Sequence, residues 1–290
     1  MNLYLRSIGF SNMENSDIKD LKESIIASSD RRRSISINQD RVYVEYYKNY
    51  GDGIGICLSG ILDEKEDLQQ HSLIPYPSSD IQTTVNEYNV LQDVNKTIVI
   101  CEHGSKNAEV NFTLQNRIDL TGNEEKFIQT GLDRTIKKTV SLTALSICGT
   151  ILLPLSKSKN QDRREDPYYN RLMVKSREGD EKAKKMLTAF ETKSLRNMYR
   201  RLKDEDILSV VDNYLLPIDD DSSSSYDILA KIIAIDSVFN LETGEEVLKL
   251  TLGVLSMEFQ LFINKYDILG MPIVGMRFMG NCKFHGVVTV

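Results

Sequence analysis

The sequence predicts an α+β protein with a mixed N-terminal sheet domain, a short helical middle and a C-terminal five-stranded β-barrel. Three observations predict this class. Strand-like alternation with turn signals fills the first half, apolar stripes at helical spacing follow, and short strand-like segments close the chain. The predicted boundaries are 1–155 for the sheet domain, 156–217 for the helical segment, 218–226 for a linker and 227–290 for the barrel.

The N-terminal half mixes one helix with hairpins. Ile18, Leu21 and Ile25 share one face, so we expect an amphipathic helix over roughly residues 17 to 28. The alternation in "SISI" and "RVYVEYY" predicts strands, and "NYGDGIG" predicts the turn of a hairpin that returns through "GICLSGIL". A second hairpin is expected to turn at Gly104 to Asn107, and the prolines of "SLIPYPSSD" predict a loop between the hairpins.

The middle of the chain predicts three short amphipathic helices. Ala183, Met186, Leu187 and Phe190 fall on one face of the first. Ser194 is the expected cap of "LRNMYRRLK", whose apolar residues have the same spacing. The third, "EDILSVVDNYLLP", is expected to start after Asp204 and to end at Pro217.

Five strands are predicted after the polar stretch "IDDDSSSSYD". They cover residues 228–239, 246–254, 257–264, 274–279 and 284–290. Glycines such as Gly280 and Gly286 permit the sharp coiling that closure of a small barrel demands. Five strands in so short a segment predict an OB-like barrel, the type that binds oligonucleotides or oligosaccharides.

Charge, hydropathy and cysteine usage predict a cytoplasmic protein. The formal net charge is −6, yet residues 157–203 hold fifteen Lys or Arg against seven Asp or Glu. The start "NLYLRSIGF" lacks the features of a secretion signal. The longest apolar run, Val140 to Leu155, is shorter than a membrane span, so no membrane partner is expected. The four well-separated cysteines are expected to be free and buried; they are Cys57, Cys101, Cys148 and Cys282.

Two motifs resemble ligand sites and are better explained as strand structure. The glycines of "YGDGIGICLSG" resemble a phosphate cradle, but no helix follows them, so we interpret them as the hairpin turn. Cys101 with His103 and Cys282 with His285 hold the four ligand types of a zinc site. Strand geometry sends Cys282 and His285 to opposite faces unless a bulge intervenes, so neither a metal nor a cofactor is expected.

Part of the chain resembles an uncharacterised family. "REGDEKA", "DILSVVDNYLLPI", "LETGEEVLKLTL" and "INKYDILGMPIVGMRFMGN" carry the likeness, together with the start "LYLRSIGFSN". They resemble a domain-of-unknown-function family of roughly 290-residue proteins from anaerobic Gram-positive (clostridial) bacteria. The resemblance implies an intracellular bacterial protein and supplies no catalytic residues.

We therefore expect a non-catalytic binding or scaffold protein. Its expected contact surface is the basic face that holds Arg196, Arg200, Arg201 and Lys203, either against a protein partner or against this protein's own acidic domains. Two alternatives stay open: an enzyme whose unknown catalytic residues lie between the N-terminal domain and the barrel, and nucleic-acid binding through the basic helices and the barrel. The outward positions of the second and third barrel strands argue against the latter, because Lys249, Glu258 and Phe262 make a poor stacking groove.

Overall fold

A computed structural model describes most of the chain, and its contacts divide it into two compact units. The described residues are 2–36, 41–63, 67–85, 88–92, 97–103, 108–116, 118, 138–155, 167–201, 206–218, 223–255 and 257–289. The first unit combines Met1–Leu152 with Asn213–Val290, and the second is Leu153–Asp212.

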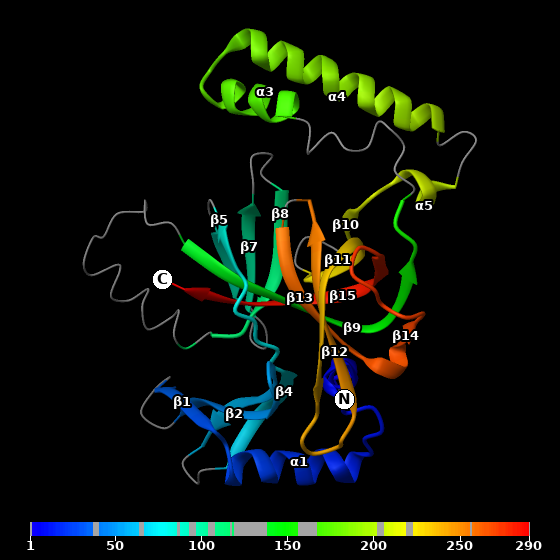
Figure 1. Ribbon diagram of the computed structural model, residues 1–290. Helices are drawn as coiled ribbons and strands as arrows, with labels where there is room; N and C mark the ends of the chain where they lie inside the picture. Colours follow the sequence, from blue (N-terminus) through cyan, green and yellow to red (C-terminus); the bar gives the residue numbers. More distant parts are fainter. Residues whose placement is uncertain are drawn as a thin grey trace. The chain divides into compact units, whose positions relative to one another are not determined.

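A four-stranded antiparallel sheet forms the N-terminal part of the first unit (Figure 1). Its strands, in spatial and chain order, are β1 (Arg31–Ser36), β2 (Val42–Gly51), β3 (Ile54–Leu62) and β4 (Leu68–Pro75). The turn between β2 and β3 holds Gly53 at a φ of 76°, which confirms the hairpin predicted from "NYGDGIG". The turn expected at Gly104 to Asn107 lies outside the described residues.

The prediction of a loop over "SLIPYPSSD" is wrong for the first half of this segment. Residues Ser72 to Pro75 belong to β4 and pair with β3. Proline is tolerated there because β4 is an edge strand and Pro75 is its last residue, where no ladder donor is required.

The helix α1 (Asn15–Ala27) lies against β2 and β3 of this sheet, whereas the 3₁₀ helix η1 (Leu3–Ile8) contacts β4 and, more extensively, the barrel described below. The predicted helix is therefore confirmed, with Asp17 accepting a hydrogen bond from the Glu14 backbone N–H at 2.8 Å. Leu21 and Ile25 pack with Val44 of β2 in a core that also takes in Phe262.

The C-terminal part contains a closed five-stranded barrel, which confirms the α+β prediction with a small barrel. Its strands are β11 (Ser225–Phe239), β12 (Glu246–Val254), β13 (Met257–Asn264), β9 (Lys138–Leu152) and β15 (Arg277–Thr289). They neighbour one another in that order, and β15 pairs back onto β11 to close the ring. The β13–β9 pair is parallel and the other four pairs are antiparallel. Phe259, Phe278 and Phe284 are fully buried in its core.

Two strands of the barrel differ from the prediction. The segments 274–279 and 284–290 are not separate strands, because Gly280 lies within the single strand β15. The fifth position is taken by β9, whose residues Val140 to Leu152 were expected in the N-terminal sheet. Gly149 of β9 is required here, since a Cβ atom would lie 2.2 Å from the Phe278 ring.

Shorter strands extend the barrel sheet. They are β5 (Gln82–Val85), β6 (Tyr88–Gln92), β7 (Thr97–His103), β8 (Ala108–Leu114), β10 (Tyr214–Pro217) and β14 (Ile268–Leu269), the last preceded by the 3₁₀ helix η2 (Lys265–Asp267). The third predicted helix is wrong after Val210, because Tyr214 to Pro217 pair with β11 as a strand. Beta-strand pairing, which sequence periodicity does not encode, outweighs helical spacing at this position.

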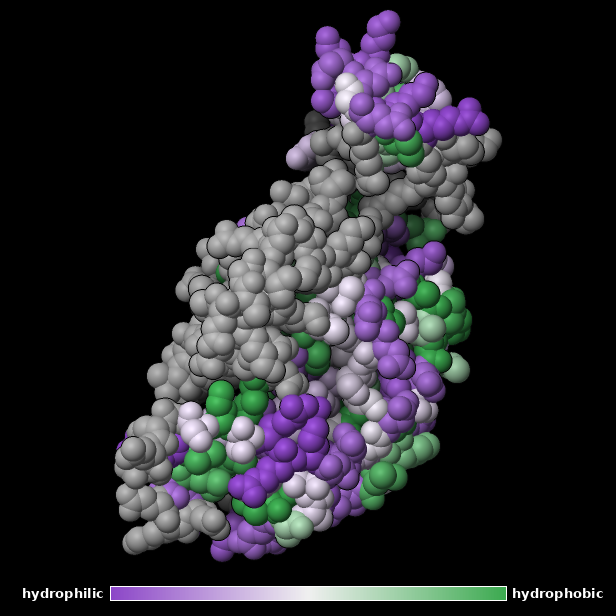
Figure 2. Space-filling model, turned by 90° about the vertical axis from the view of Figure 1, so that its left-hand side faces the viewer, coloured by the Kyte–Doolittle hydropathy of each residue, from purple (hydrophilic) through white to green (hydrophobic). Residues whose placement is uncertain are grey.

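The second unit is helical. It consists of α3 (Pro167–Arg177), α4 (Glu181–Arg201) and α5 (Ile207–Val210). Helices α3 and α4 pack together across a turn at Gly179, whose φ is 91°. The predicted start of a new helix at Ser194 is wrong, since α4 runs through it; an interior Ser costs less than about 0.7 kcal/mol. The helices at the top of Figure 2 carry mainly hydrophilic side chains.

Candidate functional site

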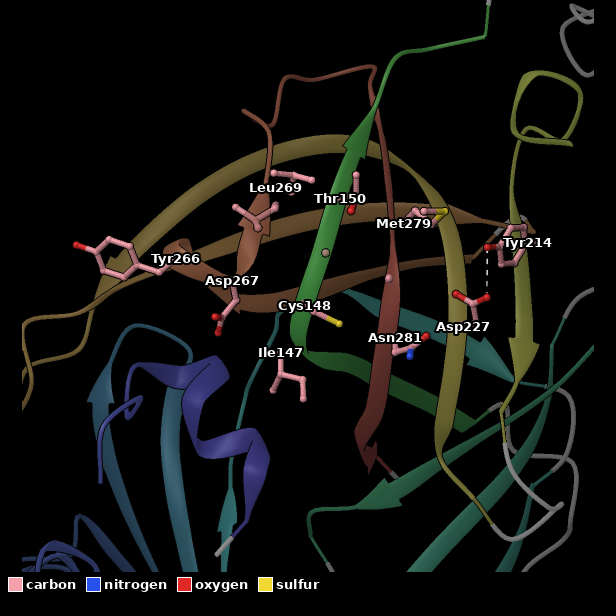
Figure 3. Close-up of a pocket in the computed structure, with 13 residues that line it drawn as sticks. Ile147, Cys148, Thr150, Tyr214, Asp227, Tyr266, Asp267, Leu269, Met279 and Asn281 are labelled. Carbon is pink, nitrogen blue, oxygen red and sulfur yellow. Dashed lines mark hydrogen bonds between the residues drawn. The ribbon is translucent and has the colours of Figure 1, made fainter. Parts of the chain in front are cut away.

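An open groove lies on the outer face of the barrel, where β9, β15 and β11 run side by side (Figure 3). Its volume is about 600 Å³, within the range of small-molecule and peptide sites. Cys148, Asn281 and Asp227 lie in a row across the three strands, and Tyr214 of β10 borders the row. Its other lining residues are Ile147, Gly149, Thr150, Tyr266, Asp267, Ile268, Leu269, Met279 and Gly280.

A β-bulge in β9 shapes the groove floor. Gly149 faces Gly280, but Ser146 faces Cys282, so β9 contains one residue more than β15 over this interval. The Ser146 Oγ atom lies 2.8 Å from the carbonyl oxygen of Cys148 and 2.7 Å from that of Asn281. The bulge re-aims the side chains that follow it. Cys148 is consequently exposed, so the prediction of a buried thiol is wrong for Cys148, although it is confirmed for Cys57, Cys101 and Cys282.

Both carboxylates of the groove already have partners. The Arg6 Nε atom donates to Asp267 Oδ2 at 2.6 Å, and this hydrogen bond raises the pKa of Arg6. The Tyr214 hydroxyl donates to Asp227 Oδ2 at 3.3 Å. Burial, and then the Asp227 charge, raise the pKa of Tyr214. The described lining residues include no histidine, lysine or arginine, so Cys148 has no neighbouring base of the kind that activates a nucleophile.

An apolar loop borders the groove. We use this name for Tyr266 to Val274, in which five large side chains are exposed: Tyr266 (83%), Leu269 (71%), Met271 (78%), Ile273 (49%) and Val274 (59%). The Tyr266 ring points away from the groove floor (Figure 3). Monomeric proteins rarely expose so many large apolar side chains together, so this loop is the strongest candidate for a contact surface.

The apolar loop is held in place by backbone hydrogen bonds. The Gly275 N–H donates to the Ile232 carbonyl, and the Ile232 N–H donates to the Met276 carbonyl, both at 2.8 Å. Gly270 and Gly275 adopt φ values of 94° and 91°, which L side chains rarely adopt. The exposure therefore accompanies a defined backbone conformation. The sequence pattern missed it because "NKYDILGMP" lies between two predicted strands and its exposure is not encoded locally.

Three of the four predicted basic contact residues lie on one helix. Arg196 and Arg200 are exposed on α4, Arg201 is its last residue, and Lys203 lies outside the described residues. Because α4 is continuous, Lys182 and Lys185, which were assigned to a separate helix, share it with the arginines.

The barrel face that was considered for nucleic acid is covered over part of its length. Val247 and Phe262, predicted to point outward, are buried under the four-stranded sheet. Lys249 is 8% exposed, and its Nζ atom contacts Asp52 Oδ2 of the β2–β3 turn at 2.6 Å. Asn264 is fully buried and donates to Glu245 and Ser11. Lys249 and Asn264 are thus used in packing, whereas Glu258 of the same face is exposed.

A second cluster of titratable side chains lies on β2 and β3. Glu45 is buried and accepts hydrogen bonds from the hydroxyls of Tyr43, at 3.2 Å, and Tyr47. Burial, followed by the Glu45 charge, raises the pKa of the Cys57 thiol. Burial also raises the pKa of Tyr47. A thiol held in its protonated form is a poor nucleophile, so this cluster is structural.

The zinc hypothesis gains no support from the residues that the structure describes, which contain no group of three or more potential metal ligands. Cys101 and Cys282 are both buried in the larger apolar core. The same residues include no helix that is long and apolar enough to cross a membrane.

Comparison with known proteins gives a family and no function. Neither a curated protein nor a solved structure matches the chain. A family model described as "Domain of unknown function, E. rectale Gene description (DUF3881)" matches residues 5–286. This match covers the barrel, the four-stranded sheet and the helical unit, and it agrees with the resemblance stated above. The chain therefore belongs to the DUF3881 family.

Proposed function

We propose that this protein is a non-catalytic binding or scaffold protein of the cytoplasm that contacts another protein through the apolar loop. The observation that carries the proposal is the fixed exposure of Leu269 and Met271 at 71% and 78%. Large apolar side chains held rigidly at a surface lose little conformational entropy on binding, and they are typical anchors of protein interfaces.

The surroundings of the loop support a protein partner. Interfaces combine an apolar centre with a polar rim, and the groove beside the loop offers Asp227, Asn281 and Thr150. The exposed free thiol of Cys148 supports a reducing compartment such as the cytoplasm.

An enzyme is the weaker candidate. The junction between the four-stranded sheet and the barrel, where an active site was considered, is filled by apolar side chains such as Leu145, Val247 and Phe262. The groove brings an exposed thiol and two partnered carboxylates together without a base for the thiol. These features favour binding over chemistry.

The test uses a cysteine-directed photo-crosslinker in the full chain with Cys148→Ser. The reagent is attached at Met271→Cys, or at Leu241→Cys as the control, because Leu241 is 81% exposed outside the loop. In lysate of the native host, Met271→Cys is expected to give one discrete polypeptide adduct that Leu241→Cys does not give. The captured protein is then purified, and its affinity for Met271→Asp is measured against that for Leu241→Asp.

We expect Met271→Asp to weaken this affinity at least about 30-fold, as for an interface anchor, and Leu241→Asp to leave it unchanged. An adduct between two copies of this chain would identify the partner as a second copy. The absence of a discrete adduct, or an equal loss for both Asp variants, would refute the proposal.

A further inference from the structure

A straight row of basic side chains runs along α4. Five side chains form the row. Successive residues of an α-helix are rotated by about 100°, which places these five side chains within an arc of about 80° around the helix axis. Its ends are about 27 Å apart at a rise of about 1.5 Å per residue. All five side chains are exposed; we call Lys182, Lys185, Lys193, Arg196 and Arg200 the basic row.

Nothing among the described residues neutralises the basic row. The ion pair on this helix joins Lys184 to Glu181 at 2.8 Å, and both residues lie outside the arc. The opposite face of the helix packs on α3 and buries Ala183 at 2% exposure. The row therefore faces solvent as an uncompensated line of positive charge.

Helix stability does not explain the row. Cations near a helix C-terminus are favourable, which accounts for Arg196 and Arg200. Lys182 and Lys185 lie in the first turns, where the helix dipole disfavours positive charge. A ligand with a line of negative charge accounts for both ends.

We infer that the basic row binds the phosphate backbone of duplex nucleic acid without sequence preference. A duplex presents a phosphate about every 1.7 Å along its axis when both strands are counted, so a straight row about 27 Å long lies beside the backbones of both strands, which together supply phosphates for its cations. Three of the five are lysines, a residue depleted at protein interfaces, which disfavours an acidic protein.

Two other ligands fit less well. A single strand needs several aromatic side chains to stack its bases; on the described part of α4, Tyr199 is the exposed aromatic residue, and the comparable barrel face is buried. A lipid surface needs a free apolar face, whereas the apolar face of α4 packs on α3. This inference uses residues separate from the apolar loop, so it does not depend on the proposed function.

The electrostatics predict weak, strongly salt-dependent binding. The whole chain has a net charge of −6, which opposes association. Five phosphate contacts give a slope of about −4.5 in log Kobs against log salt, or an affinity loss of about 500-fold between 50 and 200 mM salt.

The test measures the fluorescence anisotropy of a labelled 20-base-pair duplex, as DNA and as RNA, titrated with full-length protein at several salt concentrations. Arg196→Glu with Arg200→Glu should reduce the slope by about 2 and the affinity at least about 30-fold at 50 mM salt. The matched control, Lys19→Glu with Lys231→Glu, makes the same change in net charge at exposed residues of the first unit and should bind like the wild type.

Thermal melts of each variant check folding, and Arg196→Gln with Arg200→Gln serves as a milder second variant that should also weaken binding. Fluorescent poly-glutamate and vesicles of anionic lipid replace the duplex in parallel titrations. The inference is overturned if the wild type fails to bind duplex at 20 mM salt, if the control loses as much affinity as the Arg variants, or if poly-glutamate or vesicles bind more tightly than duplex.

Discussion

Two outer faces of the same barrel differ in their exposure to solvent. On the face of β12 and β13, Val247 and Phe262 are fully buried under the N-terminal sheet. The face of β9, β15 and β11 stays open and holds the groove, and the apolar loop lies at its border with Leu269 and Met271 exposed. On one face apolar side chains are buried and stabilise the fold, and at the border of the other they are exposed.

The comparison teaches that the barrel type alone does not locate the binding surface. A barrel of this kind is expected to bind its ligand on the face of its second and third strands. In this protein Val247, Lys249 and Phe262 of that face instead contact the N-terminal sheet and its turn. A candidate binding site therefore has to lie on a surface that stays exposed.

The largest predicted effect is a difference in thiol reactivity between the open groove and the buried core. With a disulfide reagent at pH 8, we expect the exposed Cys148 to react rapidly and the three buried cysteines to react at least about 10³-fold more slowly. The buried thiols react only through opening of the fold, which is populated at no more than about one part in 10³.

Stopped-flow absorbance measures these rates, and denatured protein gives the total of four thiols. Cys148→Ser should remove the fast phase completely. Two or more fast thiols in the native protein, or a fast phase that survives in Cys148→Ser, would contradict the assignment of one exposed and three buried thiols.

The next effect is on stability. Phe262→Ala removes a fully buried ring from the core that joins barrel and sheet, so we expect the free energy of unfolding to fall by about 3–5 kcal/mol. Tyr266→Ala, four residues along the chain, removes a ring that is 83% exposed and should change it by less than about 0.5 kcal/mol.

Urea unfolding followed by circular dichroism provides both values. Equal losses in the two variants would show that the faces do not differ in the way described. An unchanged m-value in Phe262→Ala would show that the loss is one of stability and not of cooperativity.

Much of the fold follows from local patterns. The strands over 246–254 and 257–264 were predicted with their observed bounds, because alternation and turn residues act within a few positions. The placement of β9 in the barrel was missed, since "VSLTALSICGTILLPL" is apolar on both faces and indicates a buried strand without naming its neighbours.

The candidate surfaces also differ in whether local sequence patterns reveal them. Arg196 and Arg200 were identified because exposed charge on an amphipathic helix is visible in the sequence. The apolar loop was missed because nothing in "ILGMPIV" tells whether other segments cover it; exposure is a property of the tertiary structure. Cys148 was misassigned for a related reason, since the bulge that exposes it arises from pairing with β15.

The smallest predicted effect is a pH dependence that arises from the buried cysteines. Burial raises the pKa of the Cys101 thiol to about 12, above the ordinary thiol pKa of 9.0 that applies in an unfolded chain. Between these values the unfolded state loses the thiol proton and the folded state keeps it, so stability falls as the pH rises from 9 towards 12.

The slope from Cys101 is about 1.4 kcal/mol per pH unit, and urea unfolding at several pH values from 8 to 11 measures it. Cys101→Ala should reduce the slope by this amount, because alanine has no proton to lose. Val99→Ala, a truncation in the same core, should lower stability by a constant amount and keep the wild-type slope. If both variants keep that slope, burial does not protect the Cys101 thiol from losing its proton. The contrast between a closed core and an open groove would then not extend to Cys101.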